Sequence, residues 1–342
     1  MTKILFILDF IPLPYFQTDP EIQDIVRSLG DDVEIRITDD KTLQQLPNPM
    51  EYIGKAEKVG VDWVEPAPEM LEQFADVDCV IVHWSPFNRK MIDAAPNLKF
   101  LGSMRSGFEN LEKDYAESKG IVVKNCPGRL SDSVADLTVA MMLSQNKRLL
   151  RRNLLATGGE WTRDNAQEKS YRPLCMLTIG LVGFGIIGQA VARRLAGFGA
   201  TIQAFDPYVP AEVFAQCGVQ NVDLDTLITT SDIISMHVRM TDENRGMIGK
   251  AEFAKMQPHT IFINTARAGL VDEEAMIEAL QNKQILGAGL DVFSEEPLSK
   301  ESPLLQMNNV TLTPHMGGDF PGMIQLSLGM IVSSLREYLG IS

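Results

Sequence analysis

The sequence predicts an α/β protein built from two doubly wound parallel sheets. Three observations support this prediction. Short apolar runs alternate with helical stretches, no repeat or low-complexity tract interrupts them, and a chain of 342 residues is too long for one compact core. Two domains are therefore expected.

The N-terminal part contains apolar runs that we interpret as short parallel strands. They lie at residues 4–8, 33–37, 79–83 and 99–102. The first run is too short for a signal peptide and is stopped by Asp9, so it is assigned to a buried strand. A proline-rich stretch at residues 46–68 is interpreted as surface loop and irregular helix, with no assigned chemistry.

The remainder of the chain begins with one long predicted helix at residues 131–156, with Ser131 and Asp132 as caps. Strands are then predicted at residues 178–182, 201–205, 233–237, 261–264, 286–290 and 310–313. Helices are predicted at residues 187–198, 224–229 and 272–282. A final amphipathic helix at residues 323–339 can return to the N-terminal domain, which would make that domain discontinuous.

The formal net charge of −14 argues against nucleic acid and membrane surfaces as partners, because both are anionic. An anionic substrate would then need individually placed arginines. The four cysteines are widely spaced and form no CxxC pair, so neither a metal site nor a disulfide framework is expected. No apolar run reaches transmembrane length, and a cytoplasmic location is predicted.

The sharpest motif is a glycine-rich turn between an apolar run and a helical run. Gly183 would allow a tight turn, Gly185 would let the backbone approach a pyrophosphate, and Gly188 would let the helix pack close to the strand. The helix N-terminus would present free N–H groups to phosphates. A dinucleotide site is therefore predicted.

Asp206 follows the next strand, 18 residues after Gly188. A carboxylate there suits a ribose with free hydroxyls and would repel a 2′-phosphate, which favours NAD over NADP. Two alternatives stay open: Asp206 caps a loop, or the dinucleotide is FAD.

Three polar residues follow later strands of the same half: Arg267, Glu296 and His315. Side chains at the carboxyl ends of parallel strands point into the cofactor crevice. Reduction of a keto acid needs a cation for the substrate carboxylate and carbonyl oxygen, which Arg267 can supply. It also needs a proton donor, and an imidazole such as His315 exchanges protons near neutral pH. Glu296 would orient that imidazole.

With these motifs in view, the sequence resembles the D-2-hydroxyacid dehydrogenase family, closely over about residues 100–320. The resemblance rests on four segments: Val182-Gly183-Phe184-Gly185-Ile186-Ile187-Gly188-Gln189, Asn264-Thr265-Ala266-Arg267-Ala268-Gly269-Leu270-Val271-Asp272, Gly289-Leu290-Asp291-Val292-Phe293 with Glu295-Glu296-Pro297, and Thr313-Pro314-His315-Met316-Gly317-Gly318. It implies a Rossmann NAD-binding domain at residues 125–317. It also implies a discontinuous flavodoxin-like substrate domain at residues 1–124 and 318–342, and a homodimer to which the helix after Ser131 contributes.

The resemblance also implies roles for individual residues. Arg267 would bind substrate, Glu296 would support the histidine, and His315 would be the acid/base. The expected cofactor-binding residues are Gly183, Gly185, Ile186, Ile187, Gly188, Asp206, His237, Thr265, Ala266, Asp291 and Gly317. The substrate carboxylate would bind near Arg105, Ser106 and Gly107.

The chain departs from the family pattern at two positions, Arg239 in place of a usual proline and Ala268 in place of a usual glycine. The loop that begins at Arg105 is also not the commonest form. Arg105 and Arg239 could therefore alter the substrate, or could be surface charges. An alternative function stays open, an NAD-sensing corepressor-like binding protein on the same fold. Formate dehydrogenase chemistry is disfavoured because it has no carbonyl proton transfer and would leave Glu296 without a task.

Overall fold

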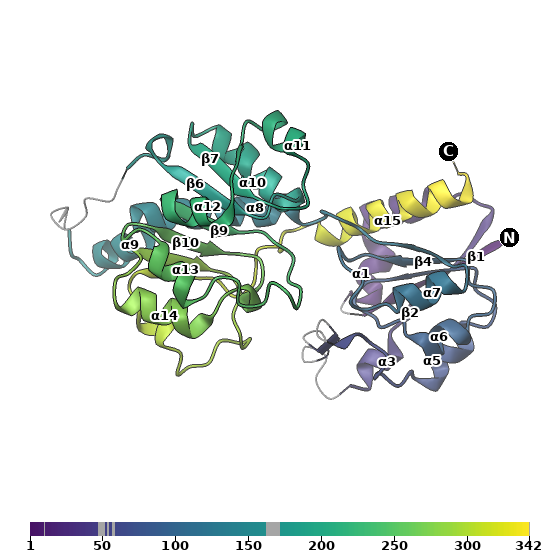
Figure 1. Ribbon diagram of the computed structural model, residues 1–342. Coiled ribbons are helices and arrows are strands. Elements are labelled where there is room, and N and C mark those ends of the chain that lie inside the picture. The colour runs from purple at the N-terminus through teal and green to yellow at the C-terminus, as the bar shows by residue number, and fades with distance from the viewer. Residues whose placement is uncertain (10, 47–51, 53–54, 57–58, 162–171, 342) are drawn as a thin grey trace. The chain divides into compact units, whose positions relative to one another are not determined.

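The computed structural model describes residues 1–9, 11–46, 52, 55–56, 59–161 and 172–341 (Figure 1). The chain divides into two compact units. Unit 1 comprises Met1–Arg129 and Phe320–Ser342, and unit 2 comprises Leu130–Asp319. The chain therefore leaves unit 1 once and returns to it with its last helix.

Unit 1 is built on a five-stranded parallel sheet. Its strands are β1 (Thr2–Leu8), β2 (Val33–Asp39), β3 (Cys79–Val82), β4 (Phe100–Ser103) and β5 (Val122–Lys124). The strand order is β2-β1-β3-β4-β5, and every neighbouring pair is parallel. This is the flavodoxin-like doubly wound order, whose direction reverses between β1 and β3.

Helices cover both faces of this sheet because β1 alternates its apolar side chains between two cores. Ile4, Phe6 and Leu8 join one core, whereas Leu5 and Ile7 join the other. Helices that contribute to the first core are α1 (Leu13–Thr18), α2 (Pro20–Arg27) and α15 (Met323–Leu339). The second core is covered by α5 (Pro68–Gln73), α6 (Arg89–Asp93) and α7 (Lys113–Ser118).

The C-terminal helix α15 (yellow in Figure 1) packs tightly on the sheet of unit 1. A Cβ atom added at Gly102 in β4 would lie 2.8 Å from Ile331 Cγ1, so a side chain at position 102 would collide with the helix. A helix at the far end of the sequence thus completes the N-terminal core.

The stretch at residues 46–68 is predicted as surface loop and irregular helix. Its described part contains helical residues, as expected, but it does not lie wholly on the surface. Tyr52, Ala56, Val61 and Val64 are buried and form a small core together with Leu43. The Tyr52 hydroxyl donates to the Trp84 carbonyl at 2.9 Å. Prolines hid this small core because they break the periodicity that signals burial.

Asp40 is a buried carboxylate that caps the short helix α3 (Lys41–Gln44). Its Oδ1 accepts the N–H groups of Thr42 and Leu43 at 2.8 and 3.0 Å. Burial raises the pKa of Asp40 to about 6, and the nearby Asp9 carboxylate adds to that shift. The uncharged form is therefore favoured in the folded protein more than in the unfolded chain.

Replacing Asp40 by asparagine is expected to stabilise the protein at pH 8 and to flatten its pH dependence. The folded-state pKa is raised, so the contribution of Asp40 to stability is present below about pH 4 and is lost as the pH rises through about 6. A rise of the Asp40 pKa from its ordinary value to about 6 corresponds to about 3 kcal/mol of stability. Urea unfolding of the wild type and of Asp40→Asn between pH 5 and 8 measures the free energy of unfolding at each pH. Asp39→Asn, at a more exposed neighbouring position, is the control, and an unchanged pH slope in Asp40→Asn would contradict the assignment.

Unit 2 is built on a seven-stranded parallel sheet. Its strands are β6 (Thr178–Val182), β7 (Thr201–Phe205), β8 (Gln220–Asn221), β9 (Ile233–Met236), β10 (Ile261–Asn264), β11 (Gly287–Leu290) and β12 (Val310–Leu312). The order is β12-β11-β10-β9-β6-β7-β8, so the direction of winding reverses between β6 and β9. This is the Rossmann order with one additional strand, and the predicted fold class is confirmed.

Two groups of helices cover the unit 2 sheet. One core contains residues of α8 (Ser131–Lys147), α10 (Ile186–Ala196) and α11 (Ala211–Gln216). The other contains residues of α12 (Leu224–Thr230), α13 (Lys250–Lys255) and α14 (Glu273–Gln281). Gln145, near the end of α8, ties that helix to the sheet by donating to the Ala288 carbonyl at 2.6 Å.

The long helix predicted at residues 131–156 is wrong in two respects. It is broken at Arg148, which adopts the left-handed conformation with φ of +46°, so that α8 ends there and α9 (Leu149–Thr157) begins. Neither Ser131 nor Asp132 is the N-cap, because Leu130 holds that position without a side-chain cap. The apolar periodicity runs through the break, so no local signal marked it.

Candidate active site

The glycine-rich turn joins β6 to α10 at the point where the sheet reverses. Gly183 has φ of +98°, and a Cβ atom there would lie 2.6 Å from the His237 carbonyl carbon. A Cβ atom at Gly188 would lie 2.3 Å from the Gly183 carbonyl oxygen. Both positions therefore require glycine on steric grounds.

Gly185 differs from these two glycines because it is exposed and a Cβ atom there would meet nothing within 4 Å. It is the N-cap of α10, and no side chain among the described residues caps that helix end. Open space and uncapped N–H groups coincide here, which is the arrangement that binds phosphate groups. Ile186 is 55% exposed at the first position of the helix and Ile187 is partly buried, so an apolar surface borders the turn.

Asp206 follows β7 and is bound to the same turn. Its Oδ2 accepts the Phe184 N–H at 2.8 Å, and its Oδ1 accepts the Tyr208 N–H at 2.9 Å. The residue is half-buried, and each carboxylate oxygen can accept a second hydrogen bond. Asp206 therefore caps a loop, as the alternative prediction held, and keeps acceptor capacity for hydroxyl groups.

His237 follows β9 and lies behind the turn. Burial lowers the pKa of His237 to about 3, so its imidazole is neutral at physiological pH. Its backbone N–H donates to the Val182 carbonyl at 2.7 Å. The close approach of Gly183 to this backbone makes His237 a support for the turn.

Arg267 is held in an extended conformation three residues after β10. The buried Asn264 fixes its backbone, since Asn264 Nδ2 donates to the Arg267 carbonyl and Asn264 Oδ1 accepts the Ala266 N–H, both at 3.0 Å. The Arg267 side chain is exposed, and its Nη1 donates to the Ala266 carbonyl at 2.8 Å. The guanidinium is thus presented at the carboxyl edge of the sheet by a braced turn.

Glu296 and His315, predicted separately from two strand ends, are brought together. His315 Nδ1 lies 2.7 Å from Glu296 Oε2, while Glu296 Oε1 accepts the Phe293 N–H at 2.9 Å. An ionised carboxylate can only accept, so Nδ1 carries the proton of this hydrogen bond and Nε2 is the nitrogen left to exchange one. The two side chains are 36% and 45% exposed, so that exchange is open to the surroundings.

The loop that carries His315 is anchored by Asp291, whose side chain is buried. Asp291 Oδ1 accepts the Thr313 hydroxyl at 2.5 Å and the Met316 N–H at 2.9 Å, and Oδ2 accepts the Gly317 N–H at 2.8 Å. His315 itself has φ of +51°, a conformation that a non-glycine residue adopts only where its surroundings enforce it. The structure therefore gives Asp291 and Gly317 a positioning role for the histidine.

The Thr265 hydroxyl forms a hydrogen bond within the protein. Its hydroxyl lies 2.8 Å from the hydroxyl of Thr138 in α8, and Thr138 in turn donates to the Val134 carbonyl at 2.7 Å. This chain of hydrogen bonds joins α8 to the end of β10. Sequence reasoning gave no role to Asn264 or Thr138, both of which are buried polar residues. Asn264 ends a predicted strand, and a polar residue at such a position is a signal that could have found it, whereas Thr138 had no comparable signal.

Comparisons with known proteins agree on one family. Residues 139–317 match the family model described as D-isomer specific 2-hydroxyacid dehydrogenase, NAD binding domain. The glyoxylate reductase of Thermococcus litoralis is 37% identical over 287 residues, which cover 80% of this chain and 85% of that protein. The chain belongs to the D-isomer-specific 2-hydroxyacid dehydrogenase family.

Other relatives in this family bear different names. The hydroxypyruvate reductase of Thermotoga maritima is 37% identical over 277 residues, which cover 80% of this chain and 88% of that protein. The D-3-phosphoglycerate dehydrogenase of Methanocaldococcus jannaschii is 39% identical, but the chain spans only 47% of its length. Among solved structures, the D-lactate dehydrogenase of Aquifex aeolicus complexed with NAD and lactic acid is similar, with a TM-score of 0.71, 25% identity and coverage of 98% of this chain and 95% of that one.

Membership of this family confirms the predicted NAD-dependent dehydrogenase and does not favour the corepressor-like alternative. The residues present fit the cofactor, since Gly185 offers open space at an uncapped helix N-terminus and Asp206 offers carboxylate oxygens at the end of β7. These residues would hold the pyrophosphate and the adenosine ribose.

Asp206→Ala is expected to lower kcat/KM with NADH by about 10- to 100-fold and with NADPH by much less, because the carboxylate both binds ribose hydroxyls and repels a 2′-phosphate. Initial rates with each cofactor give the ratio of kcat/KM with NADH to kcat/KM with NADPH. Asp206 also holds the Phe184 N–H, so some loss common to both cofactors is expected. Asp223→Ala, a helix cap elsewhere in unit 2, is the matched control. A ratio as large as that of the wild type would remove Asp206 from cofactor selection.

The predicted substrate loop lies in unit 1, directly after β4. Arg105 is buried, its guanidinium carbon lies 3.1 Å from the centroid of the Trp84 ring, and its backbone N–H donates to the Ser103 hydroxyl at 3.2 Å. Ser106 is exposed and Gly107 is half-buried. Arg105 is therefore no surface charge, whereas Arg239, the other departure from the family pattern, is exposed.

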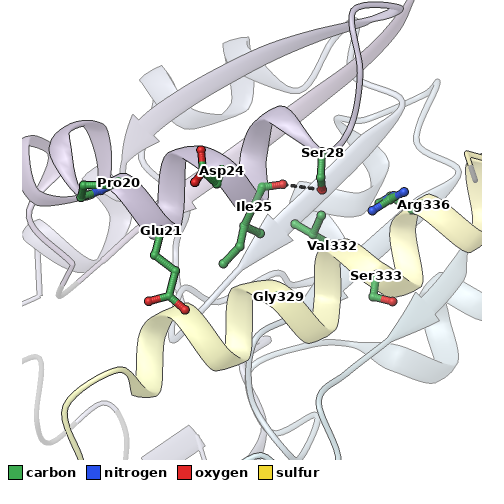
Figure 2. A pocket seen from close by; sticks show the side chains of 9 residues that line it. All are labelled: Pro20, Glu21, Asp24, Ile25, Ser28, Gly329, Val332, Ser333 and Arg336. Atoms are coloured by element: carbon green, nitrogen blue, oxygen red, sulfur yellow. Dashed lines mark hydrogen bonds between the residues drawn. The ribbon is translucent and has the colours of Figure 1, made fainter.

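A groove elsewhere in unit 1 contains none of the predicted site residues. Figure 2 shows it between α2 and α15, with Ile25 and Val332 facing each other across it and Glu21 and Arg336 at its rim. Its lining mixes apolar side chains with charged and hydroxyl-bearing ones, and we assign it no ligand.

Among the described residues, no helix combines the length and the apolar character that crossing a membrane requires.

Proposed function

We propose that the protein interconverts a small 2-keto acid and the corresponding D-2-hydroxy acid, with His315 as the acid/base and Arg267 as the substrate-binding cation. The observation that supports this most is the 2.7 Å contact between His315 Nδ1 and Glu296 Oε2. It leaves Nε2 as the proton-exchanging nitrogen and holds the ring in one orientation. His315 adopts a left-handed backbone conformation, which costs a non-glycine residue stability. Such residues cluster at functional sites.

In the direction of reduction, Arg267 orients the substrate through its carboxylate and polarises the carbonyl oxygen with a fork of N–H donors. His315 Nε2 donates a proton to that oxygen, and Glu296 stabilises the imidazole as its charge changes. When bound, the cofactor would supply the hydride as NADH in this direction and would accept it as NAD⁺ in the reverse direction. In the direction of oxidation, His315 Nε2 accepts the hydroxyl proton.

In unit 1, we assign the loop of Arg105, Ser106 and Gly107 to the substrate carboxylate, with residues 1–124 and 318–342 as the substrate-binding part. A small substrate is supported by the relatives named glyoxylate reductase and hydroxypyruvate reductase. Arg105 lies within 3.9 Å of Glu109 and is already partly neutralised, which disfavours a substrate with several anionic groups.

A panel of 2-keto acids with NADH tests this function. Glyoxylate, hydroxypyruvate, pyruvate and phosphohydroxypyruvate are each incubated with the protein, NADH consumption is followed, and the product is analysed on a chiral column. We expect the highest kcat/KM with a small monocarboxylate and a D-configured product where the product is chiral. An L-configured product, or no turnover of any member, would contradict the proposal.

We further infer a homodimer and a cytoplasmic location. Helix α9 exposes Leu149, Leu150 and Leu154 at 60%, 49% and 70%, an apolar surface that a second copy of the chain could cover. All four cysteines are free, as expected in a reducing compartment. Sedimentation of wild type and Leu154→Glu tests the dimer, and an unchanged sedimentation coefficient would count against this surface.

A further inference from the structure

The loop that follows β4 in unit 1 is braced along its backbone. Buried Asn110 donates from Nδ2 to the carbonyls of His83 and Ser85 at 3.1 and 3.0 Å. Asn125 Nδ2 donates to the Ser106 carbonyl at 2.7 Å. The backbone on both sides of Gly107 is therefore held, and a ligand at this loop would meet a preformed surface.

One side chain of this loop lies across that surface. A Cβ atom added at Gly107 would fall 2.1 Å from both carboxylate oxygens of Glu109, so the Glu109 carboxylate fills the space beside the Gly107 backbone. Glu109 Oε2 is buried there and lies 3.9 Å from Arg105 Nη2. The Glu109 side chain as a whole is 26% exposed, which leaves it a path outward.

Glu109 thus presents a carboxylate to the two residues, Arg105 and Gly107, that the proposed function assigns to the substrate carboxylate. Two carboxylates cannot share this space, on steric grounds and because like charges in close contact repel. The loop backbone is braced, so the movable element is the Glu109 side chain.

We propose that Glu109 is an internal competitor for the substrate carboxylate, which must displace it from Gly107 in order to bind. This inference rests on the proposed function of the loop. Displacement costs binding free energy in the ground state and the transition state alike, so Glu109 sets KM and has little effect on the chemical step. It acts as a specificity-determining residue, because only ligands with a group that can replace a carboxylate at Arg105 recover that cost.

The test compares Glu109→Ala and Glu109→Gln with the wild type and with Glu112→Gln. Glu112 is a matched control, since it lies in the same region, is 20% exposed and is paired with an arginine, Arg89. Two quantities are measured on the full chain: KM and kcat for the best 2-keto acid of the panel, and the Kd of oxamate, titrated calorimetrically in the presence of saturating NADH.

We expect both KM and the oxamate Kd to fall about two- to fivefold in Glu109→Ala, the range of a partly exposed ion pair. Glu109→Gln keeps the shape without the charge, so a smaller fall is expected. The 2-keto amide of the same substrate has no carboxylate, and its KM is expected to fall less. Values unchanged in Glu112→Gln would show that the effect belongs to position 109.

A merely structural role for Glu109 predicts the opposite outcome, namely a higher KM and a lower kcat because the loop is loosened. That result, or unchanged constants in both variants of an active enzyme, would overturn the inference and leave the proposed function standing. If the wild type neither turns over a 2-keto acid nor binds oxamate, both proposals fail together.

Discussion

Arg267→Lys is expected to lower kcat/KM for the 2-keto acid by about 10²- to 10³-fold, although the positive charge is kept. A lysine offers a compact point charge, whereas the guanidinium offers two parallel N–H donors for the carboxylate and carbonyl oxygens. The braced turn at Asn264 places the side chain for that contact, and a flexible ammonium gains less from such placement. Steady-state kinetics over a range of substrate concentrations measure the effect.

The matched control for this substitution is Arg193→Lys. Arg193 lies in the same unit, its side chain is 63% exposed, and its closest carboxylate atom, in Asp132, is 4.0 Å away. Its replacement is expected to leave kcat/KM within about twofold, as for most surface positions. Near-normal activity of Arg267→Lys, with a cofactor Kd equal to that of the wild type, would remove Arg267 from the substrate site.

Glu296→Gln is expected to lower kcat by about 10²- to 10⁴-fold, the range seen when a carboxylate that orients a catalytic histidine becomes an amide. The carboxylate accepts from His315 Nδ1 and so keeps the proton on that nitrogen. An amide can donate to Nδ1 and favour the other tautomer, in which Nε2 can no longer accept a proton. Rates in both directions are measured at saturating substrate, together with nitrogen NMR of the labelled imidazole.

Glu295→Gln is the control for this experiment, because Glu295 is the exposed neighbour in the chain and contacts neither the imidazole nor the Phe293 N–H. Glutamine at 296 can still accept the Phe293 N–H through its amide oxygen, so the loop is expected to stay folded. If kcat is unaffected, or if the tautomer observed by NMR is the same in both proteins, Glu296 does not orient His315.

The parts of the fold that sequence reasoning recovered are those with a local signature. Gly183 turns with positive φ, and a Cβ atom at Gly183 or Gly188 would lie within 3 Å of other backbone, so both positions require glycine and can be recognised in the sequence. Buried parallel strands such as β6 and β10 are continuous apolar runs, which are visible without any partner strand.

Other features had no local signature and were missed. The break at Arg148 interrupts a periodic pattern at a residue of ordinary type, and the strands β5 and β8 are too short to stand out from loops. Asp40 and Arg105 are ionisable, yet both are buried beside residues distant in the sequence: Arg105 against the Trp84 ring, and Asp40 near Asp9 and Ser85. Burial of this kind depends on contacts across the fold, so composition cannot report it.

The residue types of the candidate site could be read from the chain alone: a glycine-rich turn after a strand, and Arg267, Glu296 and His315 after three later strands. The tertiary structure decided which of them meet. Strands β10, β11 and β12 are neighbours, which places their carboxyl ends along one edge, and Asp291 then turns the loop after β12 so that His315 reaches Glu296. It also decided that Glu109 lies over Gly107. Strand order, loop anchoring and rotamer choice arise from contacts between distant segments, and their free energies cannot be assigned to any one stretch of sequence.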